Sequence, residues 1–334
     1  MAGITIDILI MGKLDSIFSD AMNHLERVAN NEITPCDVMT GFEKLDKQLC
    51  GFDNGDLIVV GSRPAVGKTA FIMSCALNNA RAGVPVLFYS FDFTQLQFVN
   101  RMISMVSEVN CEKIRAGMLA QKEWEDLMTR SKELSELPIY IESDAPRKIE
   151  ELCNHIEKTV EGCKAKIVYI DYLQLLECKN TNTVENRYQE VSMFSRFLKA
   201  LARKLNIPIV AASQLNRRPE LRQEEALSYK RPTMYDLRDS GTICEDGNMV
   251  ILLSRPELMN RSGVDAEGND IRGLVEVIVA KHNNGPTTSV DLYFNERTCA
   301  FTDMSPYHTD TGDGFLGGFN GETLIGDSPD TKPF

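Results

Sequence analysis

The feature that most restricts the fold of this chain is the segment Leu57-Ile-Val-Val-Gly-Ser-Arg-Pro-Ala-Val-Gly-Lys-Thr69. An apolar run typical of a buried strand enters a tight loop that ends in Gly67-Lys68-Thr69, and an apolar helical pattern follows. A strand, such a loop and a helix in this order are the context of a phosphate-binding loop, or P-loop. Backbone N–H groups and the helix N-terminus then surround the phosphates, Lys68 neutralises their charge, and the hydroxyl of Thr69 holds Mg²⁺. The segment therefore predicts a site for a nucleotide and its magnesium ion.

The loop departs from the usual pattern G-x-x-x-x-G-K at its first position, where Ser62 stands and Gly61 lies one residue earlier. Because serine is small, we interpret the segment as a variant P-loop and not as a chance Gly-Lys-Thr at the start of a helix. The predicted nucleotide-binding residues are Gly61, Ser62, Arg63, Pro64, Ala65, Val66, Gly67, Lys68 and Thr69.

Short apolar runs alternate with longer helical patterns along the rest of the chain. We expect strands over residues 57–61, 86–90, 167–170, 207–212, 249–254 and 274–280, and helices over 13–31, 68–82, 93–108, 121–136, 147–161 and 185–205. Clusters of turn residues at 216–232 and 260–273 predict two surface loops. Short buried strands that alternate with helices predict an α/β fold with a doubly wound, mainly parallel sheet flanked by helices.

Three of the predicted strands end in polar residues, namely Asp92, Asp171 and Gln214. The C-terminal ends of parallel strands form the ligand-binding edge of such a sheet. We therefore predict that Asp171 binds Mg²⁺ beside Thr69 and that the amide of Gln214 senses the γ-phosphate. Asp92 fits two roles equally well, as the general base toward an attacking water or as the N-cap of the next helix.

Charge is unevenly distributed along the chain. The formal net charge is −12 and the pI is about 5.0, which taken alone argues against a nucleic-acid partner. Residues 301–334 carry a net charge of −5, and we expect a disordered acidic tail there. Residues 187–238 instead hold eleven Lys and Arg against five acids, a net +6. This stretch fits either solvated helix and loop faces or a basic surface for a phosphate backbone.

Composition argues against several classes of protein. The sequence has no apolar run near the ~18 residues that a membrane span needs, and no secretory signal, so we expect a cytoplasmic protein with no membrane partner. Nine scattered cysteines without a Cys-x-x-Cys pair indicate reduced thiols and neither a disulfide framework nor a zinc site.

Taken in order, the segments of this chain resemble the ATPase domain of DnaB-type hexameric replicative helicases, which has a RecA-like fold. The resemblance covers roughly residues 35–300 and rests on the P-loop region 40–71, YSFDF at 89–93, VYIDYLQLL at 168–176, the Asn-Arg-x-Gln-Glu helix within 185–218, the Arg-Pro-Thr and Asp-Leu-Arg-x-Ser-Gly block within 230–255, and VAKHNNGP at 279–286. It implies a ring of six subunits around single-stranded DNA, with ATP and Mg²⁺ between neighbours. It also implies that the loops after Gln214 and around 237–241 line the channel, where Arg238, Asp239 and Gly241 contact DNA.

The sequence departs from the family pattern at several positions. The glutamate of the family's Ser-Leu-Glu-Met motif is Asp92 here, which predicts slower hydrolysis because the attacking water needs sub-ångström placement. Asn283 stands where the family has an arginine finger. Lys281 could supply part of the missing charge across the interface, and Arg255 is another cation on the C-terminal half. The family's Glu-Gln-Asp-Ala-Asp run after the Ser-Gly pair reads Cys-Glu-Asp-Gly-Asn at 244–248 here, so the polar network that this run forms in the family is also altered. We expect no counterpart of the family's N-terminal domain here, and we expect residues 1–34 to hold a linker-like helix before an ATPase domain of 35–300.

Two functions follow from this resemblance. The first is an ATP-dependent DNA helicase or translocase acting in replication, with Lys68, Asp92, Asp171, Gln214 and Lys281 as catalytic residues. The alternative is a catalytically weak ATP-binding ring or adaptor that assembles on DNA, or on other replisome or helicase subunits, without processive unwinding.

Overall fold

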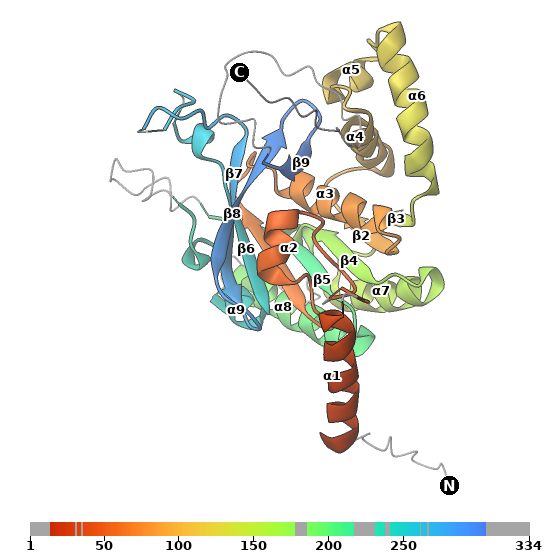
Figure 1. Ribbon diagram of the computed structural model, residues 1–334, viewed down its shortest axis with the longest axis vertical. Helices are drawn as coiled ribbons and strands as arrows, with labels where there is room; N and C mark the ends of the chain where they lie inside the picture. Colours follow the sequence, from red (N-terminus) through yellow and green to blue (C-terminus); the bar gives the residue numbers. More distant parts are fainter. Residues whose placement is uncertain are drawn as a thin grey trace, which may run out of the picture. The chain divides into compact units, whose positions relative to one another are not determined.

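The computed structural model describes residues 14–30, 32–34, 36–177, 186–216, 231–237, 241–260, 262–265 and 267–304. Nine strands form one sheet in the order β3-β2-β4-β5-β1-β6-β7-β8-β9 (Figure 1). The strands are β1 (Leu57–Ser62), β2 (Val86–Ser90), β3 (Ile139–Glu142), β4 (Ile167–Asp171), β5 (Ile209–Gln214), β6 (Met249–Ser254), β7 (Leu274–His282), β8 (Thr288–Asn295) and β9 (Ala300–Asp303). The helices are α1 (Leu14–Ala29), α2 (Glu43–Leu49), α3 (Lys68–Arg81), α4 (Gln95–Ser107), α5 (Cys111–Ala116), α6 (Gln121–Glu136), α7 (Ile149–Cys163), α8 (Asn186–Leu205) and α9 (Gly241–Asp246), with short 3₁₀ turns η1 (Leu173–Leu175), η4 (Met234–Asp236) and η5 (Pro256–Leu258).

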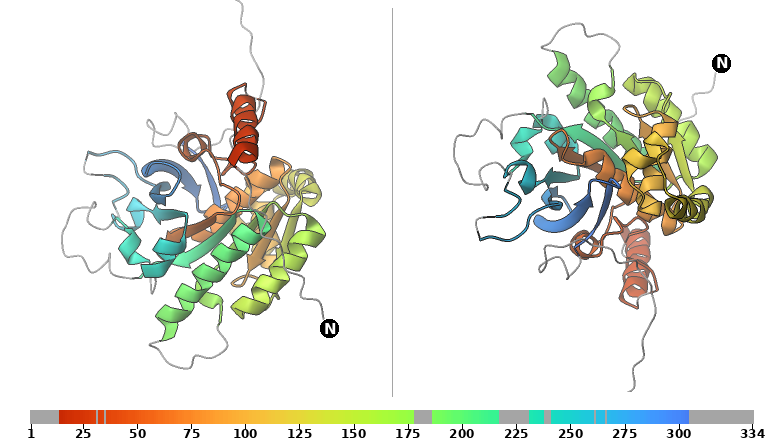
Figure 2. Two further views of the ribbon diagram at one scale, coloured as in Figure 1. Left: turned by 90° about the horizontal axis from the view of Figure 1, so that it is seen from below. Right: turned by 90° about the horizontal axis from the view of Figure 1, so that it is seen from above.

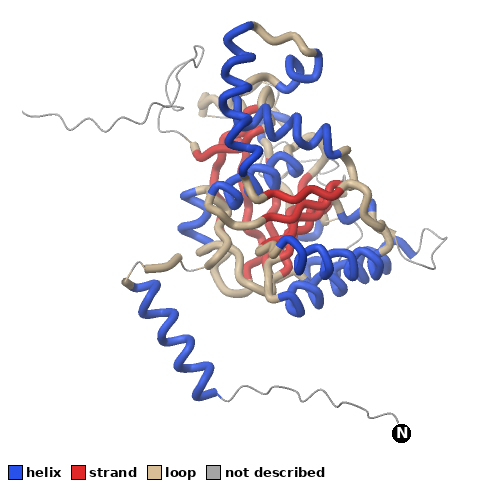
Figure 3. The backbone as a smooth tube through the Cα atoms, turned by 90° about the vertical axis from the view of Figure 1, so that its right-hand side faces the viewer, coloured by secondary structure: helices blue, strands red, loops and turns tan. Residues whose placement is uncertain are grey.

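The sheet is parallel from β3 through β6, and β7, β8 and β9 continue it as antiparallel strands. Alternate residues of the central strand β1 enter two separate cores, with Ile58 and Val60 on one face and Leu57 and Val59 on the other. Helices α2, α3 and α4 contribute to the first core, and α7 and α8 contribute to the second, so helices lie on both faces of the sheet (Figures 2 and 3). The predicted α/β fold with a mainly parallel, doubly wound sheet is therefore confirmed.

The predicted strands and long helices all lie within a few residues of the observed ones. The elements that the sequence pattern did not predict are α2, α5, α9, β3, β8 and β9. Strand β8 carries a readable signal, because Val290, Leu292 and Phe294 alternate with polar or less buried residues, as expected of an antiparallel strand with one buried face. None of the described helices is long and apolar enough to cross a membrane.

The predicted domain boundary at residue 300 is wrong, because it falls inside β9. Phe301 is only 5% exposed, and its ring packs 5.5 Å from the ring of Phe71 and 4.7 Å from that of Phe294. Its backbone N–H donates to Ser74 Oγ on α3. Residues 301–303 therefore belong to the sheet and not to an acidic tail, while residues 305–334 and 1–13 lie outside the described part of the chain.

Phe301→Ala is expected to lower the free energy of unfolding by about 3–5 kcal/mol, because it leaves a cavity between α3 and β8. Urea denaturation followed by circular dichroism measures this change. Phe301→Leu retains most of the buried volume and should cost about 1.5 kcal/mol or less. Equal stability of the Ala variant and the unmodified chain would show that β9 is not part of the folded core.

Candidate nucleotide-binding site

The loop between β1 and α3 has the backbone of a P-loop. Gly67 caps α3 with φ +112°, a conformation that residues with a side chain rarely adopt. A Cβ atom at this position would also lie 3.2 Å from the ring of Phe301, so only glycine fits. Ala65 has a positive φ of 65°, which completes the tight turn toward the helix N-terminus.

Two of the predicted nucleotide-binding residues lie within the strand and not in the loop. Gly61 pairs with Ser213 on β5 and Leu252 on β6, and a Cβ atom there would lie 2.9 Å from the Leu252 side chain. Ser62 ends β1, is buried, and donates from Oγ to the carbonyl oxygen of Arg63. Glycine is therefore needed at 61 for sheet packing, whereas residues 63–67 form the loop itself.

Lys68, Thr69 and Asp171 meet at the carboxyl edge of the sheet, as the sequence predicts. Thr69 Oγ1 donates to Asp171 Oδ2 at 2.7 Å across 102 positions of sequence. Burial lowers the pKa of Lys68, and the charges of Asp171 and Asp92 oppose this shift. The ammonium of Lys68 lies 4.1 Å from the centroid of the Tyr172 ring. Phosphate oxygens at the loop would thus meet a cation held in a largely buried position.

Asp171 has the properties of a magnesium ligand. The residue is fully buried, and burial raises the pKa of its carboxyl group, while Lys68 and the hydroxyl of Thr69 lower it. Its second oxygen, Oδ1, is buried and has no hydrogen-bond partner among the described residues. Buried polar atoms are almost always satisfied, so an unpaired carboxylate oxygen beside a threonine hydroxyl fits a ligand of a cation. Carboxylate and hydroxyl oxygens are the hard ligands that Mg²⁺ prefers.

Asp92 is not a helix cap. The helix after β2 begins at Gln95, and Thr94 caps it, because Thr94 Oγ1 accepts from the N–H of Gln97 and Gln97 Oε1 accepts from the N–H of Thr94. The exposed carboxylate of Asp92 instead acts on the pKa values of Lys68, Asp171 and Tyr172. The capping alternative is therefore wrong, and the role of Asp92 as general base stays a prediction.

Gln214 ends β5 next to Ser62 of β1. Its backbone N–H donates to Gln174 Oε1 at 3.1 Å, and Gln174 Nε2 donates to Ser213 Oγ at 2.9 Å. Sequence reasoning missed Gln174, although it lies in the segment 168–176 that carries the family resemblance. Gln174 fixes the end of the strand that presents Gln214 at this edge of the sheet, and the proposed contact of Gln214 with a γ-phosphate stays a prediction.

Lys281 and Asn283 lie at the opposite edge of the sheet. Lys281 on β7 pairs with Val250 near the start of β6, whereas the P-loop follows the end of β1. Lys281 Nζ donates to the carbonyl oxygens of Cys244 at 2.8 Å, Glu245 at 3.0 Å and Gly247 at 2.7 Å. All three ammonium hydrogens are thereby used at the C-terminal end of α9, where a cation is favourable. The predicted role of Lys281 across an interface remains a prediction, and the structure gives its side chain an internal role.

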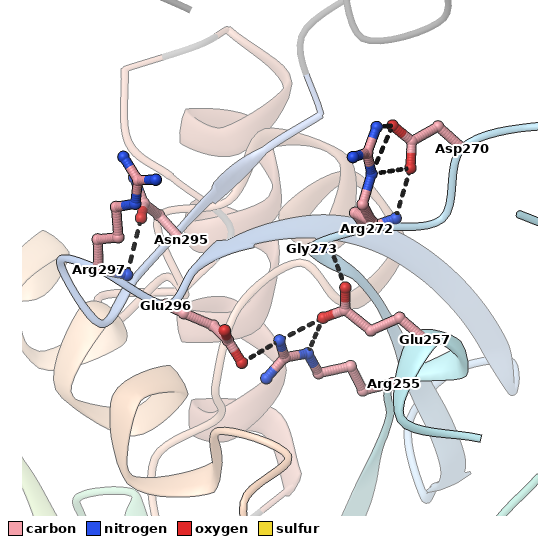
Figure 4. A network of polar contacts seen from close by, with 8 residues as sticks. All are labelled: Arg255, Glu257, Asp270, Arg272, Gly273, Asn295, Glu296 and Arg297. Atoms are coloured by element: carbon pink, nitrogen blue, oxygen red, sulfur yellow. Dashed lines mark hydrogen bonds and ion pairs between the residues drawn. The ribbon is translucent and has the colours of Figure 1, made fainter. Parts of the chain in front are cut away.

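Arg255 follows β6 and is also paired within the chain (Figure 4). It is only 4% exposed, lies between the carboxylates of Glu257 and Glu296, and has its guanidinium 5.1 Å from the centroid of the Phe294 ring. Glu257 in turn accepts from the N–H of Gly273 at 2.9 Å. Arg255 thus joins the end of β6 to the turn after β8 and does not supply an unpaired cation.

The predicted DNA contacts are described only in part. Arg238 and Asp239 lie outside the described residues, as do Arg217, Arg218, Arg222 and Lys230 of the basic stretch, and Gly241 is the first residue of α9. Three basic residues in the described part of this stretch pair with acids, namely Arg196 with Asp246 at 4.0 Å, Lys204 with Glu157 at 2.8 Å and Arg231 with Glu276.

The ends of the two predicted channel loops lie side by side. Leu215 and Leu237 form an isolated antiparallel bridge, and the N–H of Asn216 donates to the carbonyl oxygen of Asp236 at 2.8 Å. The N–H of Leu215 donates to the carbonyl oxygen of Ser62, at the end of the strand that leads into the P-loop.

Comparison with known proteins gives a consistent result. The sequence pattern of the DnaB-like helicase C terminal domain matches residues 37–303. The chain is 35% identical over 292 residues to "Replicative DNA helicase DnaB" of Geobacillus stearothermophilus and 32% identical over 314 residues to that of Rickettsia conorii, with 87% of this chain and 62% of each relative covered. It therefore spans about three fifths of the length of these relatives.

Solved structures agree with this comparison. One solved ATPase domain superposes with a TM-score of 0.77 at 29% identity, and the match covers 88% of this chain and 100% of that domain. "The Structure Of A DnaB-Like Replicative Helicase And Its Interactions With Primase" gives a TM-score of 0.75 at 30% identity, with 88% of this chain and 68% of that one covered. These likenesses confirm the predicted RecA-like fold.

Proposed function

The chain belongs to the family of the DnaB-like helicase C-terminal domain, and on this premise we propose that it is an ATP-dependent DNA helicase or translocase of replication. The observation that carries the proposal is the joining of Thr69 to Asp171 at the base of the P-loop, with Asp171 Oδ1 buried and unpaired among the described residues. A fold needs no such arrangement for its own stability, because burying an unpaired carboxylate is unfavourable. A nucleotide with its metal ion accounts for it.

Each residue of the site has a part in hydrolysis. Backbone N–H groups of residues 63–67 and the N-terminus of α3 bind the phosphates, and the ammonium of Lys68 neutralises their oxygens. Thr69 and Asp171 would hold Mg²⁺, which when bound offsets the charge that develops on the β- and γ-phosphates. Asp92 orients the attacking water and accepts its proton. Gln214 senses the γ-phosphate from the end of β5.

The placement of Lys281 and Asn283 and the exposed stripe of α1 fit a ring of identical subunits around single-stranded DNA. Lys281 and Asn283 lie at the edge of the sheet opposite to their own P-loop, so a neighbour's nucleotide is the one that this edge would reach. Helix α1 exposes Leu14, Phe18, Met22 and Leu25 at intervals of three and four residues. Such a stripe is suited to packing against an adjacent subunit. Six subunits are the number that the family resemblance implies.

A second candidate function is a catalytically weak ring or adaptor that binds ATP without processive unwinding. Asn283 favours it, because a neutral amide cannot replace an arginine finger. The internal hydrogen bonds of Lys281 favour it too, because they occupy the cation nearest to that position.

Steady-state ATP hydrolysis with and without single-stranded DNA, together with strand displacement on a forked duplex, tests the proposal. We expect DNA-stimulated turnover within the range of ordinary enzymes, ~1–10³ s⁻¹, and no turnover by the Lys68→Ala variant. Turnover below ~0.01 s⁻¹ under both conditions would contradict the helicase and support the adaptor. A monomeric mass with a non-hydrolysable ATP analogue would contradict both functions, because both require a ring.

A further inference from the structure

Tyr235 is the most exposed of the large apolar and aromatic side chains in the described part of the chain, at 86%. It is the middle residue of η4, just before the segment around 237–241 that the family resemblance assigns to DNA. Isolated exposed aromatic residues are common on protein surfaces, so exposure alone carries no function. The backbone beneath Tyr235 and its position along the chain separate it from such residues.

The turn that carries Tyr235 is fixed by hydrogen bonds on both sides. Asp236 is buried, and its Oδ2 accepts from the N–H of Thr233 at 2.8 Å and from Thr233 Oγ1 at 2.9 Å. The carbonyl oxygen of Asp236 accepts from Asn216, and that of Met234 accepts from the thiol of Cys244 at 3.3 Å. The ring of Tyr235 therefore stands in solvent on a backbone that the neighbouring residues hold in place.

The same turn is joined to the two described residues that precede basic segments of the sequence. Asn216, which is bonded to the turn, is followed in sequence by Arg217 and Arg218, and Leu237 is followed by Arg238. Asp236, the acidic residue of the turn, is buried, and its carboxylate accepts a hydrogen bond from Thr233 Oγ1. An exposed aromatic ring together with cations nearby in the sequence is the combination that binds single-stranded nucleic acid, with cations on the phosphates and the ring against a base.

We propose that Tyr235 stacks on a base of single-stranded DNA as the strand passes the turn. The proposal rests on the proposed function and adds a base contact to the phosphate contacts expected at Arg238 and Gly241. Stacking requires no particular base, because every base has a π-face, so a motor that moves along any sequence can use it. A ring held on a fixed turn loses little conformational freedom on binding, which favours the contact.

Binding of a labelled 20-nucleotide oligo-dT, measured by fluorescence anisotropy with a non-hydrolysable ATP analogue, tests this inference. Tyr235→Ala should weaken binding at least about 5-fold, and Tyr235→Phe should bind within about 2-fold of the unmodified chain, because the ring is retained. The dependence of affinity on salt should keep its slope in Tyr235→Ala, because that slope counts neutralised phosphates. Tyr140→Ala is the matched control, since it removes a 45% exposed tyrosine from the edge strand β3.

An abasic strand of the same length distinguishes stacking from a backbone contact. Tyr235→Ala and the unmodified chain should bind it equally, because it offers no base to stack on. Three outcomes would overturn the inference. Tyr235→Ala could lose the same affinity for oligo-dT and for the abasic strand, or it could bind oligo-dT as tightly as the unmodified chain. It could also change the oligomeric mass of the protein and not its affinity for DNA. If the unmodified chain binds oligo-dT, these outcomes leave the proposed function standing; if it binds no single-stranded DNA at all, the proposed function fails first.

Discussion

Asp171→Asn is expected to lower ATP turnover by about 10²–10³-fold, the loss typical of removing one group that stabilises transition-state charge. Asparagine has nearly the same shape and can still accept the hydrogen bond from Thr69 Oγ1. It lacks the negative charge that would hold Mg²⁺ at Oδ1, where the structure leaves a buried oxygen without a partner among the described residues. The measurement is steady-state hydrolysis over a series of Mg²⁺ concentrations.

The same substitution should leave the protein at least as stable as before. Burial raises the pKa of the Asp171 carboxyl group, which means that its charge is unfavourable at this position of the folded chain. A neutral amide removes that penalty, so the thermal midpoint of Asp171→Asn should equal or exceed that of the unmodified chain when both are measured without Mg²⁺. Loss of turnover together with loss of stability would instead indicate a structural role. Thr69→Ser, which keeps the hydroxyl, serves as the control that retains activity.

The residues that sequence reasoning located correctly share a local pattern. Lys68 and Thr69 are recognisable because strand, loop and helix follow one another directly. Asp171 is recognisable because a parallel sheet places the ends of its strands at one edge. The proximity of Thr69 and Asp171 then follows from the fold class, before any side-chain contact is known.

The residues that sequence reasoning placed wrongly or missed depend on contacts between distant segments. Phe301 is in the core because it meets Phe71, far along the chain, although the residues after 303 are acidic and rich in glycine. The ammonium of Lys281 donates hydrogen bonds to carbonyl oxygens at the C-terminal end of α9, a six-residue helix that the sequence pattern did not predict. The capping role of Asp92 is excluded by a competing residue, Thr94, whose partner Gln97 completes the cap.

Some of the positive charge of the basic stretch is used within the fold. The basic stretch 187–238 is not uniformly available, because Lys204 and Arg231 pair with acids. Lys199 donates to the carbonyl oxygen of Asp246 at 3.0 Å. Part of the stretch is therefore engaged within the fold, a phosphate-binding role for the rest stays a prediction, and the case for DNA rests on the loop residues and on Tyr235 more than on the net charge.

Asn283→Arg is expected to raise ATP turnover by about 10-fold or more, which is part of the 10³–10⁵-fold that an arginine finger is worth in other P-loop enzymes, because the unmodified chain is expected to turn over within the ordinary range already. The backbone at this position is already fixed, because the N–H of Asn283 donates to the carbonyl oxygen of Asn248 at 2.9 Å. Its edge of the sheet is remote from the P-loop of the same chain, so a gain must come from a neighbouring subunit. Steady-state hydrolysis in the presence of single-stranded DNA measures the gain.

Mixed rings decide whether the arginine acts between subunits. A chain with both Lys68→Ala and Asn283→Arg has no working site of its own but offers a finger, while the unmodified chain has an intact site without one. Mixing the two should therefore raise turnover above that of the unmodified chain alone, and mixing with Lys68→Ala alone should lower it. No gain in the mixture, despite a gain by Asn283→Arg alone, would place the arginine within its own subunit and contradict the shared site. No gain in either experiment would mean that the interface geometry has changed along with the residue, and would favour the adaptor over the motor.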